Sequence, residues 1–338
     1  MTPLIGHERL DLMTLWLLVL WLTLPVDGAV DCGVSADAIA QIREERITGS
    51  LAVAEKEARR LLECPDLEAD DRRALQLELF RILDRIGLHN NTRPVAEALE
   101  FLRQAEREAG ADDTVARASI ALALAEYFYR AGLSQHEFTV ATEHALRARK
   151  LFRELDDPVG EADAVHRLGL IELQLRNLQR ARELFDRSLE LSEKGHFRPI
   201  FLSDYHRHVG FLDRFSQDWP AAIAHFETSL AYRNEAGSRD YGLFARTALG
   251  SALVDGGRAA EAGTYLEEAL RIARDIPSPV GELRATYYLG EMHEALGEFS
   301  EAVRAYRRAD DLATELGVAG FQKAAREGVL RLTEPPAE

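Results

Sequence analysis

Apolar and small residues recur along residues 158–316 at spacings of three and four, which places them on one face of successive helices. The pattern is organised around four glycines that stand 41, 40 and 40 residues apart, namely Gly169, Gly210, Gly250 and Gly290. A fixed period in this range is typical of stacked helical hairpins. We therefore predict four consecutive hairpins in this segment.

Each of these glycines is followed by the same series of side-chain sizes. An alanine stands twelve residues later, a large apolar residue four further on, and a small residue three beyond that. The alanines are Ala181, Ala222, Ala262 and Ala302, the large residues are Phe185, Phe226, Leu266 and Tyr306, and the small residues are Ser188, Ser229, Ala269 and Ala309. We expect the large residues to form the core. Turns are predicted at Arg176-Asn177, Gln217-Asp218, Gly256-Gly257-Arg258 and Gly297-Glu298.

This arrangement resembles the tetratricopeptide repeat family, whose unit is a helix-turn-helix hairpin. The chain departs from that family in its period of about 40 residues rather than 34. It also lacks the aromatic residue of the first helix, where Glu172, Asp213, Leu253 and His293 stand instead. The resemblance implies an all-α, right-handed solenoid of about seven antiparallel hairpins with a closing helix at the C-terminus.

Three weaker hairpins precede the four clear ones. They cover residues 36–63, 68–109 and 115–154, and the first two are expected to break at residues 48–50 and 87–92. No stretch shows the period-two alternation of strands. We divide the chain into a signal peptide or short anchor (1–28), a divergent hairpin (29–64), two divergent repeats (65–157), four clear repeats (158–316), and a capping helix with a tail (317–338).

Residues 12–26 are uncharged and almost wholly apolar. As a helix they would rise about 22 Å, less than the ~30 Å hydrocarbon core of a membrane. Small residues follow, as a signal-peptide cleavage site requires. Export to the periplasm or cell envelope is therefore predicted. The alternatives are an uncleaved N-terminal segment that anchors the protein in the membrane, or a cytoplasmic location.

The chain has only two cysteines, Cys32 and Cys64. They are expected at the same end of the first hairpin, where a disulfide would close a repeat that has only one neighbour. Such a bond persists in an oxidising compartment. The alternative is two unreactive thiols in a reducing cytosol.

The net charge of −16 arises from acidic and basic residues that are interleaved along the helices. This balance argues against a nucleic-acid partner, which needs clustered Lys and Arg. His136 and His144 are eight residues apart and lack a third ligand, so no metal site is predicted. No nucleophile or phosphate-loop motif is present either. The sequence therefore predicts no catalytic residue, cofactor, metal or small-molecule substrate.

In the resembled family the first helices of successive repeats line a concave groove that holds a peptide or a partner helix. Matching the helix faces of this chain to that groove gives a set of candidate partner-binding residues: Asp163, His166, Leu170, Asp204, Arg207, Phe211, Arg214, Phe244, Thr247, Ser251, Arg284, Tyr287 and Glu291. Arginine and aromatic side chains often dominate binding energy. The alternative for Phe211 and Phe244 is that they pack within the superhelix.

Two functions are compatible with these patterns. The first is a non-enzymatic, protein-binding scaffold of the cell envelope. The second is a regulatory or sensor module for a signalling or transcription partner. Only Thr-Glu-Pro-Pro-Ala-Glu follows Leu332, so we expect such a module to act in trans.

Overall fold

The computed structural model describes residues 33–92, 96–131, 134–195 and 198–333. The described residues form helices and no strand. The helices are α2 (Ala36–Thr48), α3 (Leu51–Leu62), α4 (Ala69–Asn90), α5 (Ala96–Glu108), α6 (Thr114–Ala131), α7 (Gln135–Glu154), α8 (Pro158–Gln174), α9 (Leu178–Ser192), α10 (Pro199–Phe215), α11 (Trp219–Glu235), α12 (Arg239–Asp255), α13 (Ala259–Asp275), α14 (Pro279–Ala295), α15 (Phe299–Leu316) and α16 (Ala319–Thr333).

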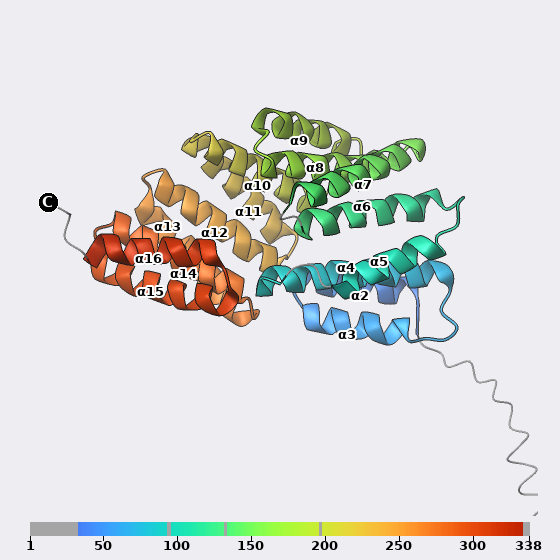
Figure 1. Ribbon diagram of the computed structural model, residues 1–338, viewed down its shortest axis with the longest axis horizontal. Coiled ribbons are helices and arrows are strands. Elements are labelled where there is room, and N and C mark those ends of the chain that lie inside the picture. Colours follow the sequence, from blue (N-terminus) through green and yellow to red (C-terminus); the bar gives the residue numbers. More distant parts are fainter. Residues whose placement is uncertain (1–32, 93–95, 132–133, 196–197, 334–338) are drawn as a thin grey trace, which may run out of the picture.

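Consecutive helices pack as hairpins, from α2 with α3 to α14 with α15, and α16 closes the stack against α15. Figure 1 shows the hairpins following one another around an arc. The all-α solenoid with about seven hairpins and a closing helix is therefore confirmed. The predicted N-terminal signal segment and Cys32 lie outside the described residues.

The four repeat glycines are explained by the large residue of the following helix. A Cβ atom at Gly169 would lie 2.7 Å from the ring of Phe185, and one at Gly250 would lie 2.5 Å from Leu266 Cδ2. The equivalent pairs are Gly210 with Phe226 and Gly290 with Tyr306. All four large residues are buried, so their prediction as core residues is confirmed. Glycine therefore lets the two helices of each hairpin approach closely.

Each predicted turn contains a residue in the left-handed region, at an equivalent position of every repeat. These residues are Arg176 (φ 64°), Gln217 (φ 60°), Gly257 (φ 75°) and Gly297 (φ 77°). Glycine adopts this conformation without steric cost, whereas a residue with a Cβ is strained. The first two turns are therefore less favourable than the last two.

The expected break at residues 87–92 is wrong in part, because α4 continues to Asn90. Its last turn packs against the C-terminal repeats, where Leu88 joins a cluster that includes Leu243 and Phe244. His89 Nδ1 lies 2.7 Å from Ser278 Oγ. These tertiary contacts outweigh the helix-breaking tendency of Gly87. The end of α4 thus contacts α14, and the N-terminal helices lie beside the last repeats (Figure 1).

Candidate functional site

A cavity of about 500 Å³ lies between the N-terminal helices and the repeats. One side is formed by α2 and α4, and the other by the inner helices α6, α8 and α10, with contributions from α11 and α12. Six arginines line this cavity, namely Arg46, Arg81, Arg85, Arg167, Arg198 and Arg233. The charged lining also contains four carboxylates, Asp84, Glu126, Asp163 and Asp204. An arginine-rich cavity is unexpected in a chain whose net charge is −16.

On the N-terminal side, a single buried carboxylate organises three arginines. Glu78 accepts hydrogen bonds from Arg43 Nε at 3.1 Å, Arg46 Nε at 2.9 Å and Arg81 Nη1 at 2.6 Å. Burial disfavours the ionised form of Glu78, but the three guanidinium groups outweigh burial and lower the pKa. Burial also lowers the pKa of Arg46, and the charges of Arg81 and Arg85 lower it further against the attraction of Glu78.

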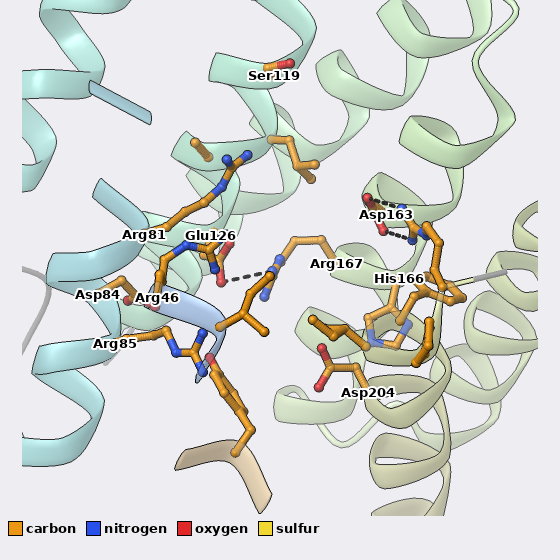
Figure 2. A pocket seen from close by; sticks show the side chains of 18 of the residues that line it. Arg46, Arg81, Asp84, Arg85, Ser119, Glu126, Asp163, His166, Arg167 and Asp204 are labelled. Carbon is orange, nitrogen blue, oxygen red and sulfur yellow. Dashed lines mark hydrogen bonds and ion pairs between the residues drawn. The ribbon is translucent and has the colours of Figure 1, made fainter. Parts of the chain in front are cut away.

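On the repeat side, the arginines pair with carboxylates of neighbouring helices. Arg167 lies 3.1 Å from Glu126. Arg198 binds Asp163 through two hydrogen bonds of 2.6 and 3.0 Å. Figure 2 shows Arg167 extending from this side toward Arg46, Arg81 and Arg85 on the opposite side. The cavity is therefore cationic from both directions.

Asp204 is the carboxylate shared by two arginines of the repeats. Arg233 donates a hydrogen bond to it, and Arg207 lies 3.8 Å away. Burial opposes ionisation of Asp204, but the two arginines prevail and lower its pKa. Burial lowers the pKa of Arg207 despite this carboxylate. One carboxylate thus only partly balances the positive charge around it.

The two sides of the cavity meet at a buried ion pair between α4 and α12. Arg85 pairs with Asp240, which is fully buried and also lies 3.5 Å from His89 Nε2. The guanidinium carbons of Arg85 and Arg233 lie over the ring of Tyr241, at 4.2 and 4.6 Å from its centroid. These contacts join helices that are far apart in the sequence and hold the two sides of the cavity together.

The structure brings together only part of the predicted partner-binding set. Asp163, His166 and Asp204 line the cavity. His166 Nε2 lies 2.8 Å from His208 Nδ1, and burial lowers the pKa of His166 to about 3, so this imidazole is neutral at physiological pH. Arg207 is adjacent, with Nη2 2.7 Å from His208 Nε2.

Other predicted groove residues pack within the protein. Four of them are buried, namely Leu170, Phe244, Thr247 and Ser251. Phe211 is half-buried and contacts Phe226 edge to face, at a centroid distance of 5.1 Å. Both phenylalanines therefore adopt the packing alternative.

The remaining predicted groove residues pair or pack with neighbours away from the cavity lining. Arg214 pairs with Asp255 at 2.7 Å. The Tyr287 hydroxyl donates a 2.8 Å hydrogen bond to Glu291. The guanidinium of Arg284 lies over Phe244 and Phe321. These residues belong to other parts of the repeats than the cavity.

The arginines of α2 and α4 were not predicted from the sequence. Their only sequence signal is the clustering of Arg81 and Arg85 one turn apart on a predicted helix. Arg167 was missed as well, although this residue is adjacent to the predicted His166. Within the described residues, no group of three or more His, Cys, Asp or Glu side chains has the arrangement of a metal site.

Comparisons with known proteins agree with this architecture. Residues 162–194 and 243–315 match models of the tetratricopeptide repeat. The chain therefore contains tetratricopeptide repeats. No significant match to a curated protein was found. These repeats support a protein-binding role.

Solved structures with related folds include three Rap or phosphatase proteins. A Rap protein complexed with competence and sporulation factor has a TM-score of 0.62 and 15% identity, covering 88% of this chain and 85% of that one. Aspartyl phosphate phosphatase F from Bacillus subtilis has a TM-score of 0.55 and 13% identity, over 90% and 81%. The apo form of RapI has a TM-score of 0.52 and 15% identity, over 79% and 97%. At these identities the likeness shows that the tetratricopeptide repeat chain shares their fold.

Proposed function

We propose that this tetratricopeptide repeat protein is a non-enzymatic scaffold that holds a segment of a partner protein in the cavity between α4 and its repeats. The observation that carries this proposal is a cavity of about 500 Å³, lined by charged, aromatic and aliphatic side chains from the N-terminal helices and the repeats. Ligand sites usually have volumes of ~300–1,000 Å³. The Rap protein complexed with competence and sporulation factor supports the idea that this fold accommodates a bound factor.

A peptide-display selection against the purified protein tests the proposal. Ser119 lines the cavity, so Ser119→Trp should fill part of it without changing the charge. The matched control is Val115→Trp, one turn earlier on α6, where the side chain is exposed. Selected peptides should bind Val115→Trp as they bind the wild type, and Ser119→Trp at least tenfold more weakly. Equal binding to all three proteins, or no selected peptide, would refute the proposal.

The alternative function is a regulatory module that acts in trans. The buried ion pair between Arg85 and Asp240 favours this function, because it joins the N-terminal helices to the repeats and an occupant of the cavity would contact both. Such an occupant stabilises the arrangement of the N-terminal helices and the repeats to which it binds more tightly. A selected peptide should then slow hydrogen exchange in α2 to α5 well beyond the residues it touches. Protection confined to the cavity lining would favour the simple scaffold.

The proposed setting is the cell envelope, which rests on the apolar residues 12–26 and on the pair Cys32 and Cys64. Within the described residues, no helix combines the length and apolar character needed to cross a bilayer. Cys64 is buried, whereas Cys32 falls outside the described residues, so the bond between them stays a prediction. Intact mass without reductant tests both points. A species that lacks about 28 residues and two hydrogens is expected. A full-length, reduced species would contradict export and the disulfide together.

A further inference from the structure

The cavity carries more positive charge than the protein itself neutralises. The network formed by its charged lining residues and their direct ion-pair partners contains eight arginines: Arg46, Arg81, Arg85, Arg130, Arg167, Arg198, Arg207 and Arg233. It contains six carboxylates: Glu78, Asp84, Glu126, Asp163, Asp204 and Asp240. With every carboxylate ionised, the network keeps an excess of two positive charges. An unbalanced buried charge is costly unless a ligand supplies the counter-charge.

The hydrogen-bond donors in this network are also in excess. Within the part of the chain that the structure describes, four buried Nε atoms of the network, those of Arg85, Arg167, Arg198 and Arg207, have no hydrogen-bond acceptor, whereas one buried acceptor, Asp240 Oδ2, has no donor. Glu78 is divided among three guanidinium groups and Asp204 between two. Donors therefore outnumber acceptors in the network, which favours a ligand that brings acceptors of its own. A buried donor without an acceptor destabilises the empty protein.

Not all of the lining is charged. Ile47, Leu122, Ile200 and Phe201 contribute apolar surface between the arginines. A bare phosphate or a polyanion such as nucleic acid would leave this apolar surface without a partner. A peptide that alternates carboxylates with aliphatic side chains matches both parts of the lining.

We propose that the occupant of this cavity is an acidic peptide segment, with a carboxylate held between Arg46 and Arg81 of the N-terminal helices and Arg167 of the repeats (Figure 2). This inference rests on the proposed function and specifies its ligand. Arg81 is the most accessible of the three, with 37% of its side chain exposed. Because Glu78 keeps Arg43 and Arg46 as partners, Arg81 can be replaced without leaving that carboxylate unpaired.

The probe is an end-blocked, fluorescein-labelled peptide of sequence Glu-Leu-Glu-Leu, compared by fluorescence anisotropy with Gln-Leu-Gln-Leu. The full chain should bind the acidic peptide at least tenfold more tightly, and Arg81→Gln should weaken its binding by a similar factor. The control is Arg271→Gln, which removes one positive charge from an exposed arginine of α13. This control should change the affinity less than twofold, since it alters the net charge equally but lies outside the cavity.

Four results would overturn the proposal, and only the last of them also overturns the function on which it rests. If display-selected peptides bind but the acidic peptide binds no better than its glutamine analogue, the scaffold stands and the preference for acid fails. If inorganic pyrophosphate displaces the acidic peptide at equal concentration, the site takes small anions instead. Equal weakening by Arg81→Gln and Arg271→Gln would show that only the overall charge matters. If no peptide of either kind or from the display selection binds, the proposed function itself fails.

Discussion

Replacing Gly250 with alanine should destabilise the protein, although alanine is the better helix former. A Cβ at this position would lie 2.5 Å from Cδ2 and 2.6 Å from Cγ of Leu266. Leu266 is fully buried, and a close-packed interior leaves its branched end little room to move. Alanine gains about 1 kcal/mol of helix propensity over glycine. Overpacking of this kind costs about 1–3 kcal/mol. Because two atoms must be displaced, we expect the upper end of that cost and a net loss of about 1–2 kcal/mol.

Gly263 provides a matched control in the same hairpin. It lies inside α13, and the only atom near a Cβ there is Met292 Sδ, at an ordinary contact distance of 3.4 Å. Gly263→Ala should therefore stabilise the protein by up to about 1 kcal/mol. Urea denaturation followed by circular dichroism measures both effects as a change of midpoint at constant slope. The reasoning is refuted if Gly250→Ala is as stable as Gly263→Ala.

A double variant separates the clash from any loss of backbone flexibility. Leu266→Ala alone should cost about 2–5 kcal/mol, because it leaves a cavity in the core. Combined with Gly250→Ala, the new methyl group has room and fills part of that cavity. The double variant should be more stable than the sum of the single effects by about 1–3 kcal/mol. Strict additivity would mean that the contact with Leu266 is not the reason for glycine.

Three further predictions concern single residues. Burial raises the pKa of Asp84 to about 6; the charge of Arg130 opposes this shift and that of Glu126 adds to it. The protonated carboxyl therefore contributes stability that is fully present below its ordinary pKa of 3.8 and is lost as the pH rises through 6. Urea titrations at several pH values should show wild-type stability falling over that range, and the fall should disappear in Asp84→Asn. Asp240→Asn should cost about 3 kcal/mol in the same assay, because it leaves a buried arginine without a counter-charge; a loss below about 1 kcal/mol would mean that this seam is unimportant. Gln217→Gly should raise the melting temperature, since glycine relieves about 1 kcal/mol of left-handed strain, and a lower melting temperature would contradict the assigned turn.

The solenoid could be predicted because its information is local. Gly250 and Leu266 are only sixteen residues apart, and their sizes recur in every repeat. The same periodicity placed Asp163, His166 and Asp204 on the inner side, where they line the cavity. It could not separate them from Leu170, which lies one turn beyond His166 on α8 but does not line the cavity. The periodicity therefore identifies which side of the helix faces the cavity, but not how far along the helix the cavity extends.

The arginine-rich cavity could not be predicted, because it depends on a contact between distant parts of the chain. Arg85 pairs with a residue 155 positions later, and the His89 ring contacts one 189 positions later. No periodicity links such residues, and Gly87 even indicates that the helix should end before it reaches them. The helix is completed by packing against α12 and α14, so its length follows from the closed solenoid and not from its own sequence.

The contact between the N-terminal helices and the later repeats also explains why arginines, and not only apolar side chains, line the cavity. The cavity is walled by the first and the later repeats, so a purely apolar contact there would collapse and leave no space. Guanidinium groups repel one another and so keep the space open. Being planar, they can also pair with carboxylates and stack over aromatic rings such as that of Tyr241. Apolar seams of comparable size would be expected to stabilise the empty fold more. Holding the positive charges of Arg46, Arg81 and Arg167 around an open space costs free energy, and the proposed acidic ligand would offset that cost.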